Sequence, residues 1–125
     1  MARYVYYNRN DNPTVERNDC VTRAISLASD LPYRTIRRKL RYTARLLDCE
    51  KLCVSCYEWL IREVLGGKPV NCEGMTINDF AELHPYGTYL LRMDGHISTL
   101  IDYTLYDIFD CRNHRITNAW KMPNN

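Results

Sequence analysis

The stretch TYLLRMDGHISTLIDYTLYDIF, residues 88–109, decides the fold. It consists of short segments rich in β-branched and aromatic residues, which favour strands. An Asp-Gly pair at 94–95 and an Asp-Tyr pair at 102–103 separate the segments, and such pairs are typical of tight turns between adjacent strands. We therefore predict an antiparallel meander, completed by a last strand near residues 115–120.

The chain before this stretch is mostly helical in pattern. A short strand is predicted at residues 4–7. Three later segments have apolar residues at helical spacing: residues 20–29, 33–47 and 53–65. A short fourth helix should follow Thr76 and end near His84, because Thr76 and Asp79 resemble a capping box. We predict a single α+β domain over residues 1–125, with N-terminal helices packed on a C-terminal antiparallel sheet of four or five strands.

Composition and charge fit an ordinary globular domain. Of the 125 residues, 46% are apolar and 26% are charged, and the net charge of +2 is too small to indicate nucleic-acid binding by itself. No segment approaches the roughly 18 apolar residues of a membrane span, and the first residues lack the apolar region of a secretory signal. We predict a cytoplasmic protein whose six cysteines are reduced thiols.

Cys20 is the candidate nucleophile. It lies in the first turn of the helix predicted at residues 20–29, directly after Asp19, a favourable N-cap residue. A helix N-terminus stabilises the thiolate, which is the reactive form of cysteine. His96 opens a predicted strand, where a neutral imidazole can act as general base toward Cys20. Arg23, one turn after Cys20, is predicted to form a structural ion pair or to raise the local positive potential.

A third residue should orient the imidazole by accepting its second N–H. The strand after His96 offers Asp107 and Asp110 near its end. A two-residue turn would pair Ser98 with Asp107 and make Asp107 a diagonal neighbour of His96. A three-residue turn would instead place Asp110 opposite His96. We favour Asp107 as the orienting residue and keep Asp110 as the alternative.

Four motifs occur along the chain in a characteristic order. They are NDCVTRAISLAS (18–29), MTINDFAELHPYGTYLLRMDGH (75–96), YDIFDC (106–111) and NAW (118–120). Together they resemble the small papain-like fold proteins that are common in bacteriophage genomes. The resemblance implies a minimal papain-like fold and a cysteine peptidase or deconjugating amidase. It also implies a protein or peptide substrate and action in the bacterial host cytoplasm. Separately, we predict no cofactor, and the lack of a long apolar segment predicts no membrane partner.

The chain departs from the papain-like pattern at one position. Papain-like enzymes often use a Gln upstream of the cysteine to stabilise the oxyanion, and residues 8–19 contain no Gln. Asn18 or Asn12 is the candidate replacement. The backbone N–H of Cys20 is the candidate for the other oxyanion donor, because it lies at a helix start and points at the developing charge.

The helix predicted at residues 33–47 carries a strongly basic face. The candidate binding residues on this face are Arg34, Arg37, Arg38 and Arg41. Such a face can contact phosphates or an acidic protein, although most basic helical faces are simply solvated. It supports an alternative function, a catalytically silent papain-fold protein that sequesters a host factor or nucleic acid.

The cysteines other than Cys20 raise the question of a metal site. Three of them could share one helical face and a fourth could close a four-thiolate zinc site: Cys49, Cys53, Cys56 and Cys72. Structural zinc sites usually pair cysteines across turns, whereas Cys53 and Cys56 fall inside a predicted helix. We therefore predict no metal.

Overall fold

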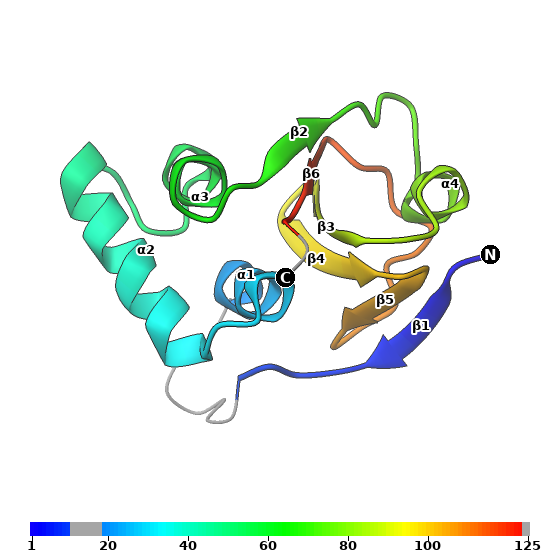
Figure 1. The fold of residues 1–125 in the computed structure, drawn as a ribbon, viewed down its shortest axis with the longest axis horizontal. Helices are drawn as coiled ribbons and strands as arrows, with labels where there is room; N and C mark the ends of the chain where they lie inside the picture. Colours follow the sequence, from blue (N-terminus) through cyan, green and yellow to red (C-terminus); the bar gives the residue numbers. More distant parts are fainter. Residues whose placement is uncertain (11–18, 124–125) are drawn as a thin grey trace.

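The computed structural model of the chain describes residues 1–10 and 19–123 (Figure 1). Its elements in chain order are β1 (Arg3–Tyr6), α1 (Cys20–Ser29), α2 (Tyr33–Leu47), α3 (Val54–Trp59), the π-helical turn η1 (Leu60–Val64), β2 (Lys68–Val70), α4 (Ile77–Leu83), β3 (Thr88–Met93), β4 (His96–Ile101), β5 (Thr104–Asp107) and β6 (Asn118–Lys121). The protein has an α+β fold, in which helices pack against a mixed, mostly antiparallel sheet.

The sheet has six strands in the order β1-β5-β4-β3-β6-β2. The predicted antiparallel meander of β3, β4 and β5 is confirmed, and β6 pairs with β3. The prediction of four or five antiparallel strands is wrong in two respects, because β1 pairs in parallel with β5 and β2 is an additional strand. β2 has only three residues, one of them a proline, so it carries no periodic signal. The local sequence of β1 does not indicate whether the strand runs parallel or antiparallel to its neighbour, because its partner β5 lies far away in the chain.

The sheet is covered on both faces. Figure 1 shows α1, α2 and α3 on one side of the strands and α4 on the other. Side chains alternate along β3, as strand geometry requires: Leu90 packs in the core with α1, α2 and α3, whereas Tyr89 and Leu91 pack in the core with Phe80 of α4. None of the described helices is both long and apolar enough to cross a membrane.

The helices form where local signals predict them. α1 and α2 have the predicted bounds, and α4 begins with the predicted capping box between Thr76 and Asp79. The expectation that Asp19 caps α1 through its side chain is wrong. Asp19 precedes the helix, but its carboxylate makes no capping hydrogen bond. It accepts hydrogen bonds from Arg23 and Tyr33 instead, because a charged donor competes better than a backbone N–H.

A two-residue turn connects β4 to β5. Ile101 pairs with Thr104, which leaves only Asp102 and Tyr103 between the strands. Both turn residues have positive φ angles, 46° and 71°, as a type I′ turn requires. The end of β5 therefore lies beside the start of β4, at the end of the sheet where α1 begins.

Candidate functional site

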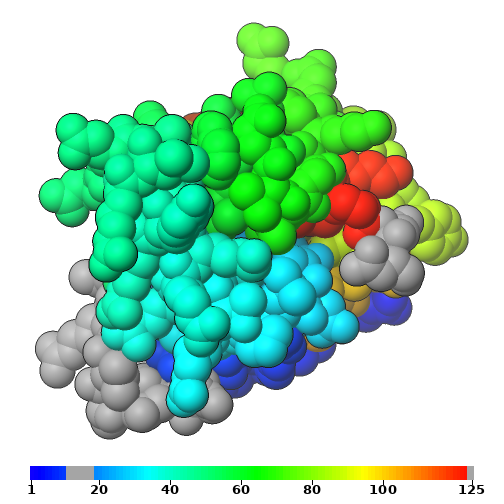
Figure 2. All heavy atoms as spheres, turned by 60° about the vertical axis from the view of Figure 1, so that its left-hand side comes forward, coloured from blue at the N-terminus to red at the C-terminus, as the bar shows by residue number. Residues whose placement is uncertain are grey.

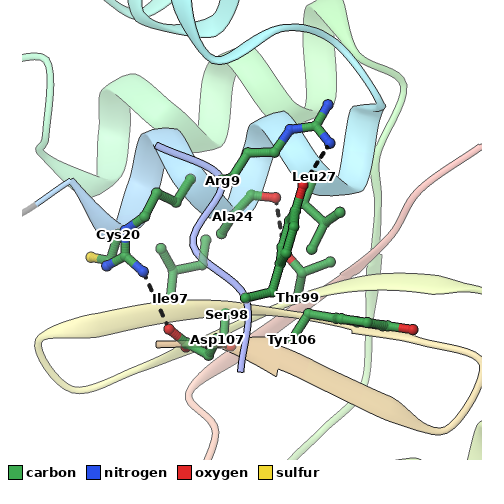
Figure 3. A pocket seen from close by; sticks show the side chains of 11 residues that line it. Arg9, Cys20, Ala24, Leu27, Ile97, Ser98, Thr99, Tyr106 and Asp107 are labelled. Atoms are coloured by element: carbon green, nitrogen blue, oxygen red, sulfur yellow. Dashed lines mark hydrogen bonds and ion pairs between the residues drawn. The ribbon is translucent and has the colours of Figure 1, made fainter. Parts of the chain in front are cut away.

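Cys20, His96 and Asp107 occupy the ends of three elements that meet at one end of the sheet. Cys20 is the first residue of α1, His96 the first of β4 and Asp107 the last of β5. The hydroxyl of Thr99 on β4 donates a 2.8 Å hydrogen bond to the carbonyl oxygen of Ala24, which fixes α1 on the sheet (Figure 3). These contacts bring together residues that are far apart in the sequence.

His96 and Asp107 form a short, buried contact. Nε2 of His96 lies 2.6 Å from Oδ2 of Asp107. The two side chains are only 12% and 3% exposed, so water screens the contact little. Because Nε2 faces Asp107, Nδ1 is the nitrogen left to interact with Cys20. The order of contacts is thiol, imidazole, carboxylate, as in a general catalytic triad.

The protonation of Cys20 and His96 favours an ion pair. Burial alone would raise the pKa of the Cys20 thiol, but hydrogen bonding and positive charge from His96 outweigh it and the pKa is lowered. Burial would lower the pKa of His96, but the hydrogen bond to Asp107, followed by those to Cys111 and Cys20, raises the pKa to about 11. The sequence-based expectation is a neutral imidazole acting as general base, whereas the raised pKa of His96 favours a protonated ring, because the buried carboxylate of Asp107 stabilises the proton.

Asp107 is held as a carboxylate. Burial by itself would raise its pKa, but hydrogen bonds from His96 and Ser98 lower it below the usual value. The Ser98 hydroxyl donates to Oδ2 at 2.6 Å, and the backbone N–H of Ile108 donates to Oδ1 at 2.7 Å. A carboxylate with this many donors is fixed in orientation and stays ionised, so it can orient the imidazolium.

Arg23 forms ion pairs with residues at the start of α1 and at the end of β5. Its Nε donates to Oδ1 of Asp19 at 2.8 Å, and its Nη1 lies 3.4 Å from Oδ1 of Asp107. Asp19 also accepts hydrogen bonds from Asn10 at 2.7 Å and Tyr33 at 2.9 Å. The predicted ion pair of Arg23 is confirmed. Burial raises the pKa of Cys20, and the positive charge of Arg23 helps to lower it, after the larger effects of His96 and of the Ile97 backbone.

Cys20 borders a small cavity on one side and an open groove on the other. The cavity has a volume of about 10 Å³, and Figure 3 shows Cys20, Ser98 and Asp107 around it. The groove has a volume of about 530 Å³ and is lined by both Cys20 and His96. Its remaining lining includes apolar side chains, two arginines and one aspartate: Leu52, Val54, Ile108, Phe109, Arg23, Arg92 and Asp19. A groove of this size can admit an extended peptide segment beside the thiol.

The other predicted site residues lie elsewhere. Asp110 contacts the guanidinium of Arg112, with Nε 2.9 Å from Oδ1 and Nη2 2.8 Å from Oδ2, and does not contact His96. Asn12 and Asn18 lie outside the described residues. The basic residues of α2 are far from the thiol in the chain and lie along the outer surface shown in cyan and turquoise in Figure 2: Arg34, Arg38 and Arg41 are exposed and Arg37 is half-buried.

The remaining cysteines do not assemble the four-thiolate set considered for zinc. Cys49, Cys53 and Cys56 interact with one another at the α2 to α3 connection and are called the α2–α3 cysteine cluster below. Cys72 packs in the other core, with Phe80 of α4. Three thiols without the fourth do not make the closed tetrahedral site typical of structural zinc.

Sequence reasoning missed several residues around the candidate site. Cys111 is fully buried, and its Sγ lies 3.8 Å from Oδ2 of Asp107. The ligand atoms of His96, Asp107 and Cys111 all lie within 4.8 Å of one another, the spacing of a possible metal site. The 2.6 Å contact between His96 and Asp107 fits a shared proton better than a bridging ion, which would hold the two atoms farther apart.

Local sequence signals could have found some of these residues. The spacing of Asp19 and Arg23 is the i, i+4 spacing of a helical ion pair. The two-residue turn places Ser98 opposite Asp107, but it does not by itself predict the hydrogen bond between their side chains. Asn10 and Cys111 carry no local signal, because their contacts exist only after folding.

Comparison of the chain with protein-family models, with curated proteins and with solved structures finds no match. The resemblance to papain-like proteins therefore rests on the motifs quoted above. The chemistry of the site has to be inferred from its own residues.

Proposed function

We propose that the protein is a papain-like cysteine peptidase or deconjugating amidase that hydrolyses an amide bond in a protein or peptide. The observation that carries this proposal is the buried contact of His96 with Asp107 next to Cys20, at the edge of an open groove. A lowered thiol pKa, a raised imidazole pKa and an accessible groove are the three properties that a thiol nucleophile needs.

The mechanism follows from the ion pair. The Cys20 thiolate attacks the carbonyl carbon, and the oxyanion accepts a hydrogen bond from the Cys20 backbone N–H, which has no partner inside α1 because Cys20 begins the helix. The His96 imidazolium donates its proton to the leaving nitrogen as the C–N bond breaks. Water then attacks the thioester while His96 accepts a proton, and the thiolate is regenerated. Asp107 orients the ring throughout.

The cellular setting follows from the resemblance. The motifs resemble bacteriophage proteins, so we place the activity in the cytoplasm of a bacterial host, on a host or phage protein. Acyl transfer between a thiolate and an amide needs only water as a co-reactant, so the proposal includes no cofactor.

The experiment that tests the proposal is site-specific alkylation. Iodoacetamide labelling followed by mass spectrometry reports the rate at each cysteine across pH, with the other five cysteines as internal references. We expect Cys20 to react fastest near neutral pH, and His96→Ala to slow it about 10- to 100-fold by removing the stabilising cation. His114→Ala is the matched control, because His114 is exposed and is not part of the groove lining.

Two results would contradict the proposal. One is a Cys20 rate no higher than the rates of the other cysteines. The other is a rate that His96→Ala leaves unchanged, because the thiolate would then not depend on the imidazolium. A Cys20 rate that falls in His96→Ala and not in His114→Ala supports an activated nucleophile and justifies a search for substrates.

A second candidate function is supported by the surface of α2. Its exposed arginines are spaced so that they follow one side of the helix: Arg34, Arg38, Arg41 and Arg45. Among the described residues none of them has an ion-pair partner. We propose this surface as the alternative basis of function, a binding protein for nucleic acid or an acidic host factor.

Binding and salt dependence separate the two functions. In the alternative, a labelled single-stranded DNA should bind the wild type, lose affinity steeply as salt rises, and lose most affinity in the double variant Arg38→Glu, Arg41→Glu. Cys20→Ala should bind as the wild type does. Absence of binding at low salt would contradict the alternative.

A further inference from the structure

Arg92 is a groove residue that makes no ion pair with a carboxylate of the described residues; the carboxylate of Asp19, which lines the same groove, is paired with Arg23. It lies on β3 and lines the groove together with Cys20 and His96. Its Nη1 donates to Oγ1 of Thr117 at 2.9 Å and to Oδ1 of Asn118 at 3.0 Å. Both acceptors are neutral. In residues 1–10 and 19–123 no carboxylate forms an ion pair with Arg92.

Arg23 provides the contrast within the same groove. Its guanidinium also lines the groove, but it contacts two carboxylates, those of Asp19 and Asp107. The positive charge of Arg23 is therefore already paired with carboxylates of the protein itself. The guanidinium of Arg92 is half-buried and, within the described part of the chain, is hydrogen-bonded only to neutral groups. An anion bound in the groove would therefore form an ion pair with a cation that has no anionic partner among the described residues.

The contacts of Arg92 also fix its position. Thr117 immediately precedes β6, and Asn118 is the first residue of β6, which pairs with β3, so both acceptors are anchored to the sheet. The Tyr57 hydroxyl of α3 interacts with the guanidinium from another side. A guanidinium held in this way presents its remaining N–H groups in a fixed fork, and this geometry matches a carboxylate.

We propose that Arg92 binds a carboxylate of the substrate, so that the groove selects acidic peptides. The proposal rests on the proposed function, since it assigns the substrate class of the same groove. The apolar walls formed by Leu52, Val54, Ile108 and Phe109 would contact apolar side chains next to the acidic one. The substrate class is therefore a peptide in which an acidic residue and apolar residues flank the bond attacked by Cys20.

A pair of alkylating reagents of nearly equal size tests the charge selectivity. Iodoacetate carries a carboxylate and iodoacetamide is neutral, so the ratio of their rates at Cys20 measures the attraction of the groove for an anion. The charges of His96 and Arg23 contribute to this ratio in every variant. At low ionic strength we expect Arg92→Gln to lower the ratio about threefold, because one unit charge is removed from the groove.

Matched variants complete the alkylation experiment. Arg38→Gln removes the same charge from the exposed face of α2 and should leave the ratio unchanged. Arg92→Lys keeps the positive charge and should largely preserve the ratio of the two alkylation rates. The inference is overturned if the ratio falls by the same amount in Arg92→Gln and Arg38→Gln. It is also overturned if the ratio stays unchanged in both variants. Because each rate at Cys20 is measured separately, this failure is distinguishable from failure of the proposed function, in which Cys20 is not activated at all.

A binding measurement keeps the inference testable even if Cys20 is inert. The Arg92 Nε–H resonance is followed during titration with N-acetylglutamate α-methylamide, which carries one carboxylate, and separately with N-acetylglutamine α-methylamide, which is neutral. We expect a saturable shift with the acidic probe and a roughly tenfold weaker response with the neutral probe, because a charged bidentate partner is replaced by a neutral one. Equal responses to the two probes, or no response to either, would overturn the inference.

Discussion

Two regions of the molecule hold partly buried thiols beside the same helical core, and they differ in the direction of the pKa shift. Cys20 lies beside His96, and its pKa is lowered although burial opposes this. In the α2–α3 cysteine cluster, burial, followed by Cys49 and Cys53, raises the pKa of Cys56 to about 12. The comparison indicates that a charged partner can reverse the effect of burial on the pKa of a thiol in this protein.

The two regions also differ in what holds them together. Around Cys20, charged and polar side chains from α1, β4 and β5 contact one another, including Arg23 and Asp107. Cys56 is fully buried in an apolar core, and its thiol donates to the carbonyl oxygen of Leu40 at 3.6 Å. The first region therefore depends on electrostatics and the second on packing.

The largest expected effect is the difference in reactivity between Cys20 and Cys56. The thiolate fraction of each residue rises as pH increases through its pKa, so Cys20 should react at a pH below that of an ordinary cysteine and Cys56 only near pH 12. At pH 7 we expect iodoacetamide to modify Cys20 at least about 10³-fold faster. Mass spectrometry of the wild type measures both rates in one sample. Similar rates at Cys20 and Cys56 would contradict the expected difference between the two regions.

Replacing Arg23 should have the next largest effect. Arg23→Met leaves the buried carboxylate of Asp19 without its cation and removes one of the two cations beside Asp107, which keeps His96, so we expect the free energy of unfolding to fall by about 3 kcal/mol. Urea denaturation measures it, with Arg38→Met as the matched exposed control. Against the effect of burial, Arg23 lowers the pKa of Asp19, so this part of the stability is present above the unfolded-state pKa of 3.8 and is lost as pH falls. The variant should therefore lose less stability on acidification than the wild type does.

Asp107 and Asp110 can be separated by the titration of His96. Asp107→Asn removes the carboxylate that raises the pKa of His96 to about 11, and we expect that pKa to fall by about 2. NMR of the imidazole carbon-bound proton follows the titration. Asp110→Asn should leave it unchanged, since Asp110 contacts Arg112. The reverse result would show that Asp110 is the orienting residue.

The smallest expected effect distinguishes packing from chemistry. Cys56→Ala leaves a small cavity in the core and should lower the free energy of unfolding by about 1 kcal/mol. Cys20→Ala removes a partly buried charged thiol, so it should change stability by less than about 0.5 kcal/mol or increase it. Urea denaturation of both variants checks this, and a larger loss for Cys20→Ala would mean that Cys20 is mainly a packing residue.

Much of the helical structure was predictable from the sequence, and part of the sheet was not. The bounds of α1 and α2 follow from apolar spacing, and the start of α4 follows from Thr76 and Asp79, all of which are signals within a few residues. β2 was missed because three residues with a proline carry no period. The parallel pairing of β1 with β5 was missed because it joins segments about 100 residues apart.

The sequence by itself determined the α+β class, the helix bounds, the two turns of the meander, and Cys20 and His96 as the pair to examine. Only the tertiary structure decided that Asp107 and not Asp110 contacts His96, that Arg23 bridges Asp19 and Asp107, and that these contacts raise the pKa of His96. The physical reason is the range of the forces involved. Helix and turn signals act between near neighbours in the chain, whereas protonation depends on burial and on charges that only folding brings together.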